Sequence, residues 1–582
     1  MSTHASRPGS SIRYQPDEKL PAALALGLAL QLAALLLPGI VLIPTTMFQA
    51  VGATDAFLLW AVSASVIACG VNTLLQAVRV GPVGAGYILT TGPPGIAIAV
   101  SAMAVAAGGP ALLATMVFIM ALFQFVVSAR LSLFRRLLTP TITGTVLMLT
   151  PVTVMPIIFD QLKNVPDGTP ALAAPLSVLA TLLVAVGIML KATGSLRLWA
   201  PGIGIAAGSA IAGVFGLYDI DRVAEASWIG LPRAEWPGFD LNFGTTFWGL
   251  LPAFLFIALL CTVQMISNAV SIQRISWRQP RAVDFRAVQG AVAADGVGNL
   301  LSGLAGTMPN GFRPTGAAMA ELTGISSRSV GVVLGASLIT LAFLPKVLAV
   351  FLAIPSPVIA AFITIMMATI FILGIKIVVQ DGLDYRKGLI AGVAFWLGVG
   401  FQNGVIFPEY VLEFAGGLLR NGMIAGGLVA IVMTLFVELT KPRRSRLEVE
   451  FGLSALQKIR DFLGVFASRN GWDTTMADRL DAVGEEALLT LLGQDEAEEE
   501  HQRRRLLLVA HREYDAAILE FVASMGEENL QDQIALLSEQ PAEDLIEREV
   551  SLRLLRHLAS SVRHQQYHDV DIVTVRVASP DG

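Results

Sequence analysis

Two stretches of the chain, residues 81–95 (GPVGAGYILTTGPPG) and residues 306–316 (GTMPNGFRPTG), place glycine and proline inside long apolar regions. Non-helical backbone has no hydrogen-bond partners in lipid, so it occurs at membrane depth only where protein buries it or where it lines a cavity. We therefore predict that both stretches are broken membrane segments and candidate binding sites. The alternative is that each stretch is a proline kink in an ordinary helix.

The apolar regions around these stretches have the length of membrane-crossing helices, about 18–25 residues each. Clear spans are expected near 22–46, 56–78, 110–134, 141–160, 172–191, 198–217, 247–272, 329–353, 357–379, 388–406 and 422–440, with shorter or interrupted ones near 81–100, 288–307 and 312–324. The broken stretches are each about third in their half of this series. We predict an all-α polytopic membrane protein of about 14 transmembrane segments, arranged as two inverted seven-segment repeats with segments 3 and 10 broken.

Charge divides the 582-residue chain into parts. Residues 1–440 hold 23 Lys and Arg against 18 Asp and Glu, whereas residues 441–582 hold 17 against 27, so the net charges are +5 and −10. One compact soluble fold does not produce such a contrast. We predict a polar tail at 1–19, a membrane body at 20–440 and an aqueous domain at 441–582.

Positive charge also predicts the orientation of the body, because cytoplasmic loops retain Lys and Arg. Arginines such as Arg79, Arg130 and Arg274 fall in alternate loops, and the loops at 47–55 and 101–109 have neither Lys nor Arg. We expect a multi-pass protein of the bacterial inner membrane with both termini in the cytoplasm. Its expected partners are the lipid bilayer and a small solute, with no nucleic acid.

The only two cysteines, Cys69 and Cys261, lie in apolar runs, and all six histidines lie outside the predicted spans. This pattern argues against a disulfide framework and against a metal site. Without a membrane histidine, a cysteine pair or a phosphate-binding loop, the chain is not expected to be an enzyme or to hold a cofactor.

Residues 294–328 (ADGVGNLLSGLAGTMPNGFRPTGAAMAELTGISSR) resemble the nucleobase-cation symporter-2 family, also called nucleobase-ascorbate transporters. Further agreement comes from YQPDEKLP at 14–21, from Thr143 and Gly144, and from Pro355 and Pro357, so the resemblance covers about residues 13–440. The resemblance implies a secondary transporter of nucleobases such as uracil, xanthine or urate-like solutes, commonly a homodimer. It also implies a core domain of segments 1–4 and 8–11 that moves against a gate domain of segments 5–7 and 12–14.

The family's solute-contacting positions fall on a few residues of segments 3, 8 and 10. These are Tyr87, Gln264, Asn268, Thr315 and Gly316. Many members have Glu where this chain has Gln264, and Glu or Gln followed by Asn where it has Thr315 and Gly316. The usual membrane carboxylate is therefore missing, and coupling to protons, coupling to sodium and uncoupled transport all stay open.

Three charged residues near the second broken stretch are candidates for function, because ionisable groups at membrane depth are rare. Asp295 and Glu321 are possible coupling groups, unless Asp295 starts segment 9 at the cytoplasmic side and Glu321 lies near the inner surface. Arg313 could hold an anionic group with two hydrogen bonds, or it could pair with Glu321 or clamp a carbonyl. An anion carrier related to sulfate permeases and a transporter-like sensor that signals through the C-terminal domain are the alternative functions.

The sequence pattern of the C-terminal part predicts an α/β sandwich. It has amphipathic helices near 453–468 and 477–492, strands at 506–510 and 571–577, and a helix near 551–563. It resembles the histidine-kinase-type ATPase domains of anti-sigma factors. Thr490 replaces the Asn of that family's helix motif after Glu486, and the segment 511–515 lacks the glycines of its nucleotide loop. We predict a degenerate, regulatory domain that does not use ATP, with a possible cytoplasmic partner.

Overall fold

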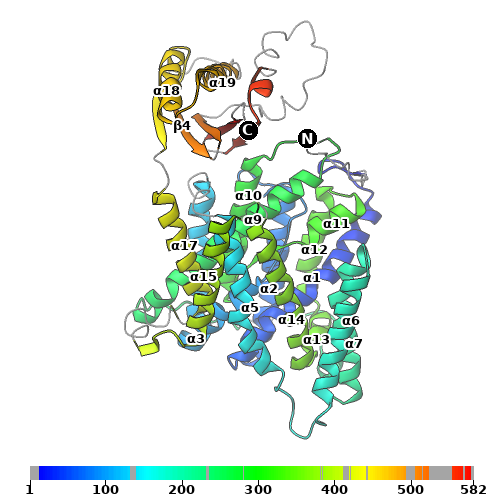
Figure 1. Ribbon diagram of the computed structural model, residues 1–582. Coiled ribbons are helices and arrows are strands. Elements are labelled where there is room, and N and C mark those ends of the chain that lie inside the picture. The colour runs from blue at the N-terminus through cyan, green and yellow to red at the C-terminus, as the bar shows by residue number, and fades with distance from the viewer. Residues whose placement is uncertain are drawn as a thin grey trace. The chain divides into compact units, whose positions relative to one another are not determined.

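The computed structural model describes residues 12–131, 139–230, 235–279, 281–379, 382, 384–409, 419, 421–440, 444–492, 505–513, 515–523, 554–567 and 570–578. The chain forms two compact units (Figure 1). The first consists of Met1–Ser128, Phe134–Arg278 and Gly290–Phe436, and the second of Ala129–Leu133, Gln279–Gln289 and Val437–Gly582. Residues 1–11 of the predicted N-terminal tail lie outside the described residues.

Up to Thr440 most of the described residues are helical. The helices are α1 (Ala22–Ala50), α2 (Asp55–Val78), α3 (Ile98–Ala129), α5 (Pro140–Gln161), α6 (Ala173–Lys191), α7 (Ser195–Val214), α8 (Ile220–Glu225), α9 (Thr245–Ile275), α10 (Phe285–Ala305), α11 (Thr315–Thr323), α12 (Arg328–Ala342), α13 (Pro345–Leu352), α14 (Ser356–Val379), α15 (Tyr385–Gln402) and α17 (Gly422–Thr440). A helical element therefore lies on each predicted apolar stretch.

Within the described residues, seven helices are long and apolar enough to cross a membrane, or eight if the bent pair α12 and α13, which meet at 82°, counts as one span. This supports a multi-pass membrane protein. The other helices are too short or too polar to meet this criterion. For example, α11 has only 9 residues, and α10 carries Asp295 and Asn299 near its centre. The count of fourteen spans stays a prediction.

A turn inside α3 separates two of the predicted segments. Gly108 has φ −151° and ψ 18°, Gly109 has φ 71°, and Pro110 follows with no backbone N–H to donate. The part of α3 before this turn completes the first broken stretch, and the part after it is the predicted span that begins near residue 110.

Glycines bring two pairs of helices into backbone contact. A Cβ added to Gly144 of α5 would lie 2.6 Å from the Gly374 carbonyl of α14, and one added to Gly374 would lie 2.7 Å from the Gly144 carbonyl. Gly70 of α2 and Gly335 of α12 meet in the same way, at 2.9 and 2.7 Å. Small residues at such crossings are how membrane helices gain packing contact without a hydrophobic driving force.

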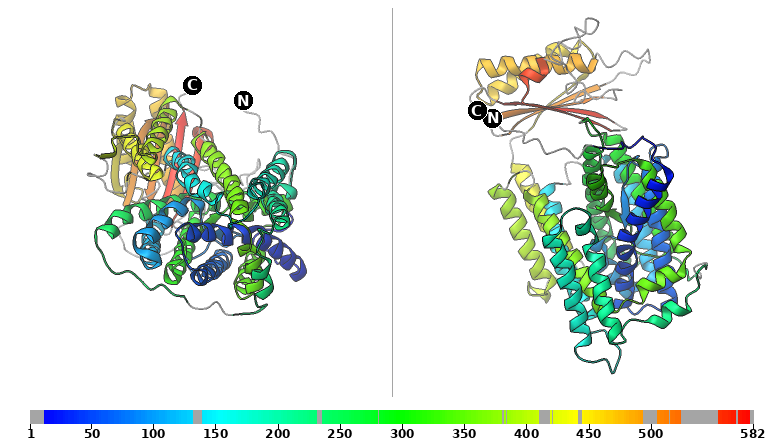
Figure 2. Two further views of the ribbon diagram at one scale, coloured as in Figure 1. Left: turned by 90° about the horizontal axis from the view of Figure 1, so that it is seen from below. Right: turned by 90° about the vertical axis from the view of Figure 1, so that its right-hand side faces the viewer.

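The second unit contains a five-stranded sheet in the order β3-β4-β5-β7-β6, with every neighbouring pair antiparallel. The strands are β3 (Ser445–Glu450), β4 (Arg505–Glu513), β5 (Ala516–Ala523), β6 (Ser561–Gln566) and β7 (Asp571–Ala578). Helices α18 (Ala455–Arg469) and α19 (Thr474–Leu492) pack on one face, as the right-hand view of Figure 2 shows. Leu463, Leu480, Leu508 and Val575 belong to the shared core.

The sheet differs from the sequence-based expectation in three strands. β3, β5 and β6 were not predicted, and residues 561–563, predicted as helix, are strand. β6 has the polar sequence SVRHQQ, which carries little strand signal by itself, and its pairing with β7 determines its conformation. The described helical residues here are 554–558, and residues 551–553 lie outside the description.

Gly374→Ala is expected to destabilise the membrane unit by about 1–3 kcal/mol, because its methyl group would push α14 away from the Gly144 carbonyl. The measurement is the Tm of the purified full chain in detergent. Gly187→Ala in α6 is the matched control, since nothing lies within 4 Å of a Cβ at that position. Equal Tm values for the two variants would contradict the close crossing of α5 and α14.

Candidate functional site

The two broken stretches pair with each other through their backbones. β1 (Thr90–Gly92) and β2 (Gly311–Arg313) form an antiparallel pair, with Thr90 opposite Arg313 and Gly92 opposite Gly311. β1 leads into the short helix η1 (Gly95–Ala97) and α3, and β2 leads into α11. The positive ends of two helix dipoles therefore flank one small strand pair.

Arg313 lies within this strand pair and is 8% exposed. Its Nη2 donates a hydrogen bond to the carbonyl oxygen of Pro93. Its guanidinium lies against Gly39 of α1, where an added Cβ would stand 3.5–3.7 Å from Nη2, Cζ and Nη1. Arg313 forms no ion pair with any residue of the described parts, and Glu321 is exposed on α11. Arg313 thus holds a backbone carbonyl, as one of the sequence-based alternatives predicted, and its guanidinium has further N–H donors.

Gly316 contributes through its backbone. Its N–H donates to Thr90 Oγ1 over 3.0 Å, and that hydroxyl donates to the Arg313 carbonyl over 2.9 Å. A Cβ at Gly316 would lie 2.6 Å from the carbonyl oxygen of Ile88. Gly316 is therefore the point where the first turn of α11 touches β1, and the half-buried Thr315 precedes it.

Gln264 and Asn268 lie four residues apart on α9 and therefore share a face of that helix. One turn earlier, Cys261 brings α9 beside β2: a Cβ at Gly311 would be 3.6 Å from its Sγ. Asn268 is 5% exposed, and its Nδ2 has no hydrogen-bond partner among the residues described. A buried donor without a partner is unfavourable unless a ligand satisfies it.

The Tyr87 side chain contacts Trp277, the second residue after the end of α9. Its hydroxyl accepts a hydrogen bond from Trp277 Nε1 at 3.3 Å, and the two rings meet edge to face at 6.5 Å. Trp277 follows the end of α9, about 20 Å along the helix direction from Gln264. The structure thus places Tyr87 beside Trp277, and it places Cys261, on the same helix as Gln264 and Asn268, beside Gly311 of β2.

Asp295 lies at the centre of α10 with no exposed surface, so it does not start that helix at a membrane surface. Asn72 Nδ2 donates to its Oδ1 and Gln124 Nε2 to its Oδ2, each over 3.2 Å. Asn299 Nδ2 donates to Gln124 Oε1, and Asn299 Oδ1 accepts the backbone N–H of Asn310, both at 2.7 Å. Sequence reasoning missed these amides, although each stands in or beside an apolar span, where an amide needs a partner.

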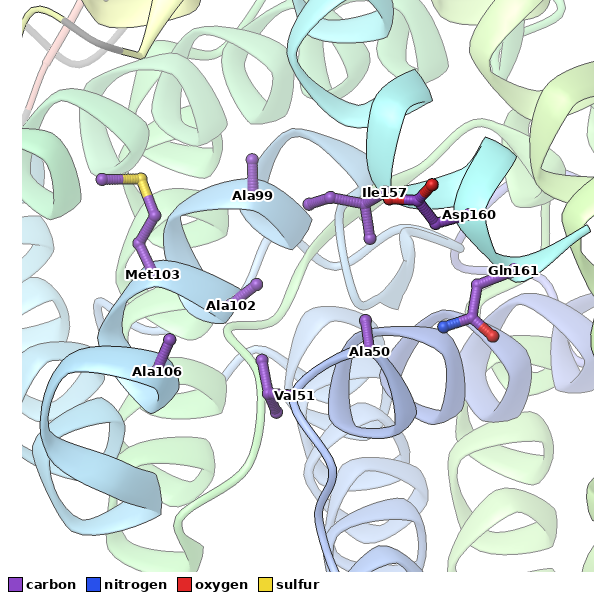
Figure 3. Close-up of a pocket in the computed structure, with 9 residues that line it drawn as sticks. All are labelled: Ala50, Val51, Ala99, Ala102, Met103, Ala106, Ile157, Asp160 and Gln161. Carbon is purple, nitrogen blue, oxygen red and sulfur yellow. The ribbon is translucent and has the colours of Figure 1, made fainter. Parts of the chain in front are cut away.

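A cavity of about 310 Å³ lies near the ends of α1 and α5 and along α3 (Figure 3). Its walls are mostly small and apolar, with a carboxylate and an amide at one side. The lining residues are Ala50, Val51, Ala99, Ala102, Met103, Ala106, Ile157, Asp160 and Gln161. None of the sequence-predicted site residues lines this cavity.

A family model described as Permease family matches residues 24–406 of the chain. Xanthine permease XanP of Escherichia coli strain K12 is 26% identical over 451 residues, which are 74% of this chain and 96% of that protein. Uric acid permease PucJ of Bacillus subtilis strain 168 is 26% identical over 428 residues, 71% of this chain and 92% of that protein.

Among solved structures, the murine anion transporter Slc26a9 in its inward-facing state is similar in fold. The TM-score is 0.50 at 12% sequence identity, and the match covers 75% of this chain and 72% of that one. At this identity the likeness concerns the fold alone.

Gly316→Ala is expected to separate α11 from β1, since the new methyl group would stand 2.6 Å from the Ile88 carbonyl. We expect a loss of about 1–3 kcal/mol of stability, measured as a lower Tm of the purified chain. Gly249→Ala in α9, where nothing lies within 4 Å of a Cβ, is the control. An unchanged Tm for Gly316→Ala would contradict the contact.

Proposed function

The chain belongs to this permease family, and on that premise we propose that it is a secondary transporter of an oxopurine such as xanthine or urate. The names of XanP and PucJ support this class of solute. The observation that carries the proposal within the molecule is Arg313, a buried cation without a counter-ion among the described residues. The partnerless amide donor of Asn268 on α9 adds to it.

The chemistry of these groups suits a planar solute with alternating N–H and C=O groups. Gln264 offers a carbonyl and an amide, and Asn268 offers a donor. Two helix N-termini and Arg313 favour negative charge in the same region. Urate is an anion near neutral pH, so a site with Arg313, and with Gln264 where many members of the family have Glu, suits it better than it suits neutral uracil.

The main alternative is a carrier of small inorganic anions. The same buried Arg313 supports it, together with the absence of a carboxylate at positions 264 and 315. Gln264 and Asn268 favour the heterocycle, because their amides match the edge of a base and add little for a spherical or tetrahedral anion.

We also propose the fourteen-segment, inverted-repeat arrangement, with α1, α2, α3 and α9–α13 in a core domain and α5–α7, α14, α15 and α17 in a gate domain. A Cβ at Gly95 would lie 2.6 Å from Met367 Cε of α14, so the tip of the broken segment 3 abuts the gate. The 310 Å³ cavity lies between α3 of the core and α5 of the gate.

The C-terminal unit is proposed to be a cytoplasmic regulatory domain. Its sheet with two helices on one face is compatible with an ATPase-like ancestry. Thr490 Oγ1 donates to the carbonyl of Glu486 in its own helix at 2.6 Å, which leaves this hydroxyl poorly placed to serve a metal or nucleotide. The cytoplasmic termini, the inner-membrane location, the homodimer and the regulatory partner stay predictions.

Reconstituted full-length protein is expected to take up labelled urate or xanthine saturably in proteoliposomes, with uracil taken up more weakly. Uptake is measured with and without a pH gradient, and with excess unlabelled sulfate as competitor. Empty liposomes are the control. Saturable sulfate uptake without uptake of any base would replace the proposal by the anion carrier, and binding of urate without uptake would favour a sensor.

Arg313→Gln is expected to weaken urate transport by about 10- to 100-fold in KM, because it removes a charge-assisted hydrogen bond worth about 1.5–3 kcal/mol. Glutamine ends where the arginine side chain has Nε and loses the Nη2 bond to the Pro93 carbonyl, so the Tm of the variant is measured beside its KM. Lys191→Gln, at the exposed end of α6, is the matched loss of charge. An equal loss for urate and neutral uracil would assign Arg313 a purely structural part.

A further inference from the structure

The residues just before α1 lie across the ends of two helices of the first unit. Tyr14 pairs with Ile325 in a parallel bridge. The backbone N–H groups of Arg13 and Tyr14 donate to the Gly324 carbonyl over 2.8 and 3.2 Å, and the Ser326 N–H donates to the Tyr14 carbonyl over 2.9 Å. We refer to residues 12–19 as the N-terminal strap.

Gly324 offers its carbonyl because of how α11 ends. Gly324 is the left-handed cap residue of α11, with φ 69° and ψ 18°, and its N–H donates to the Ala320 carbonyl over 2.9 Å. The left-handed conformation turns the next peptide away from the helix axis. The strap thus satisfies a carbonyl that the helix itself cannot use, and it leaves Gly324 and Ser326 buried.

The same strap is attached to the end of α9 through Arg278. Arg278 Nη1 and Nη2 donate to Glu18 Oε1 and Oε2 over 2.7 and 2.9 Å, which makes a bidentate pair. Its Nε and Nη2 also donate to the carbonyls of Ile12 and Arg13, over 3.1 and 2.8 Å. The Gln15 N–H and Arg278 both lower the pKa of Glu18, so the carboxylate is charged at neutral pH.

An exposed ion pair alone contributes little stability. Arg278 is different because one rigid guanidinium joins four acceptors of a single segment, two of them backbone carbonyls. The backbone bonds to Gly324 and Ser326 then transmit that position to α11. Through the strap, the end of α9 is tied to the end of α11.

These two helices carry the candidate solute groups, Gln264 and Asn268 on α9 and Thr315 and Gly316 on α11. We propose that the N-terminal strap is a positioning element that holds α9 and α11 at a fixed distance, so that solute affinity depends on Glu18 and Arg278 outside the membrane. This inference rests on the proposed transport function only for its effect on solute affinity.

The first test is hydrogen exchange in the purified full chain without solute, followed by mass spectrometry of peptides covering residues 315–328. The N–H groups of Ser326 and Arg328 donate to the strap carbonyls of Tyr14 and Pro16, over 2.9 and 3.0 Å. Arg278→Ala is expected to speed exchange at these two amides by about ten-fold, because their local opening then no longer has to break the contacts of Arg278 with the strap. Glu18→Gln keeps the shape and removes the charge, so a smaller increase is expected.

Asp17→Asn is the matched control. Asp17 is the neighbouring acid of the same strap, but its contact with Arg328 is 3.6 Å long and both side chains are exposed. It should leave exchange unchanged. Equal exchange in wild type and Arg278→Ala, or equal effects of Asp17→Asn and Glu18→Gln, would contradict the proposed role of Arg278 and Glu18 in holding the strap.

The second test is uptake of urate or xanthine in proteoliposomes. Arg278→Ala is expected to raise KM by about ten-fold with a smaller change in kcat, since two binding helices lose their relative position. Faster exchange with unchanged KM would show that the strap is structural only, and would overturn its effect on the site. If wild type takes up neither base, the proposed function fails while the exchange result still tests the strap.

Discussion

The structure depends on how three residues of each broken stretch find hydrogen-bond partners for their backbone N–H and C=O groups inside the membrane unit. β1 and β2 cannot make helical hydrogen bonds, and lipid offers none, so each needs the other. Once they pair, the starts of α3 and α11 must face the same region, and Arg313 is carried to the centre of the bundle. Gly316 and Thr90 follow from this pairing, because α11 can begin only where its first turn clears β1.

The buried amides around Asp295 extend the same constraint. The N–H of Asn310, directly before β2, fixes the orientation of Asn299, which fixes that of Gln124, whose amide then donates to Asp295. Asp295 accepts the last hydrogen bond of this series, from Gln124 Nε2. The carboxylate therefore contributes to the placement of β2, whatever else it does during transport. Asp295 and Glu321 looked equivalent in the sequence, but one is enclosed by donors and the other is exposed.

Much of the membrane unit could be predicted from the sequence because its signals are local. Apolar length indicated the helices, and Gly with Pro in residues 81–95 and 306–316 indicated the breaks. Tyr87 shows the limit: its hydroxyl meets Trp277 from a distant part of the chain, which no spacing rule could give. Asn72 and Gln124 were overlooked for the same reason, since their partner lies on α10. In the C-terminal unit, β6 has a polar sequence, and only its register with β7 makes it a strand.

The strand pair also has a consequence for biosynthesis. Thr90 and Arg313, which face each other in the pair, are 223 residues apart in the chain. At a synthesis rate of about 5–20 residues per second, β1 waits roughly 10–45 s before its partner exists. During that interval its backbone groups require water, the insertion machinery or another protein surface. The first half of the protein is therefore obliged to remain an unfinished intermediate, and the sheet that completes it closes only after the second half has entered the membrane.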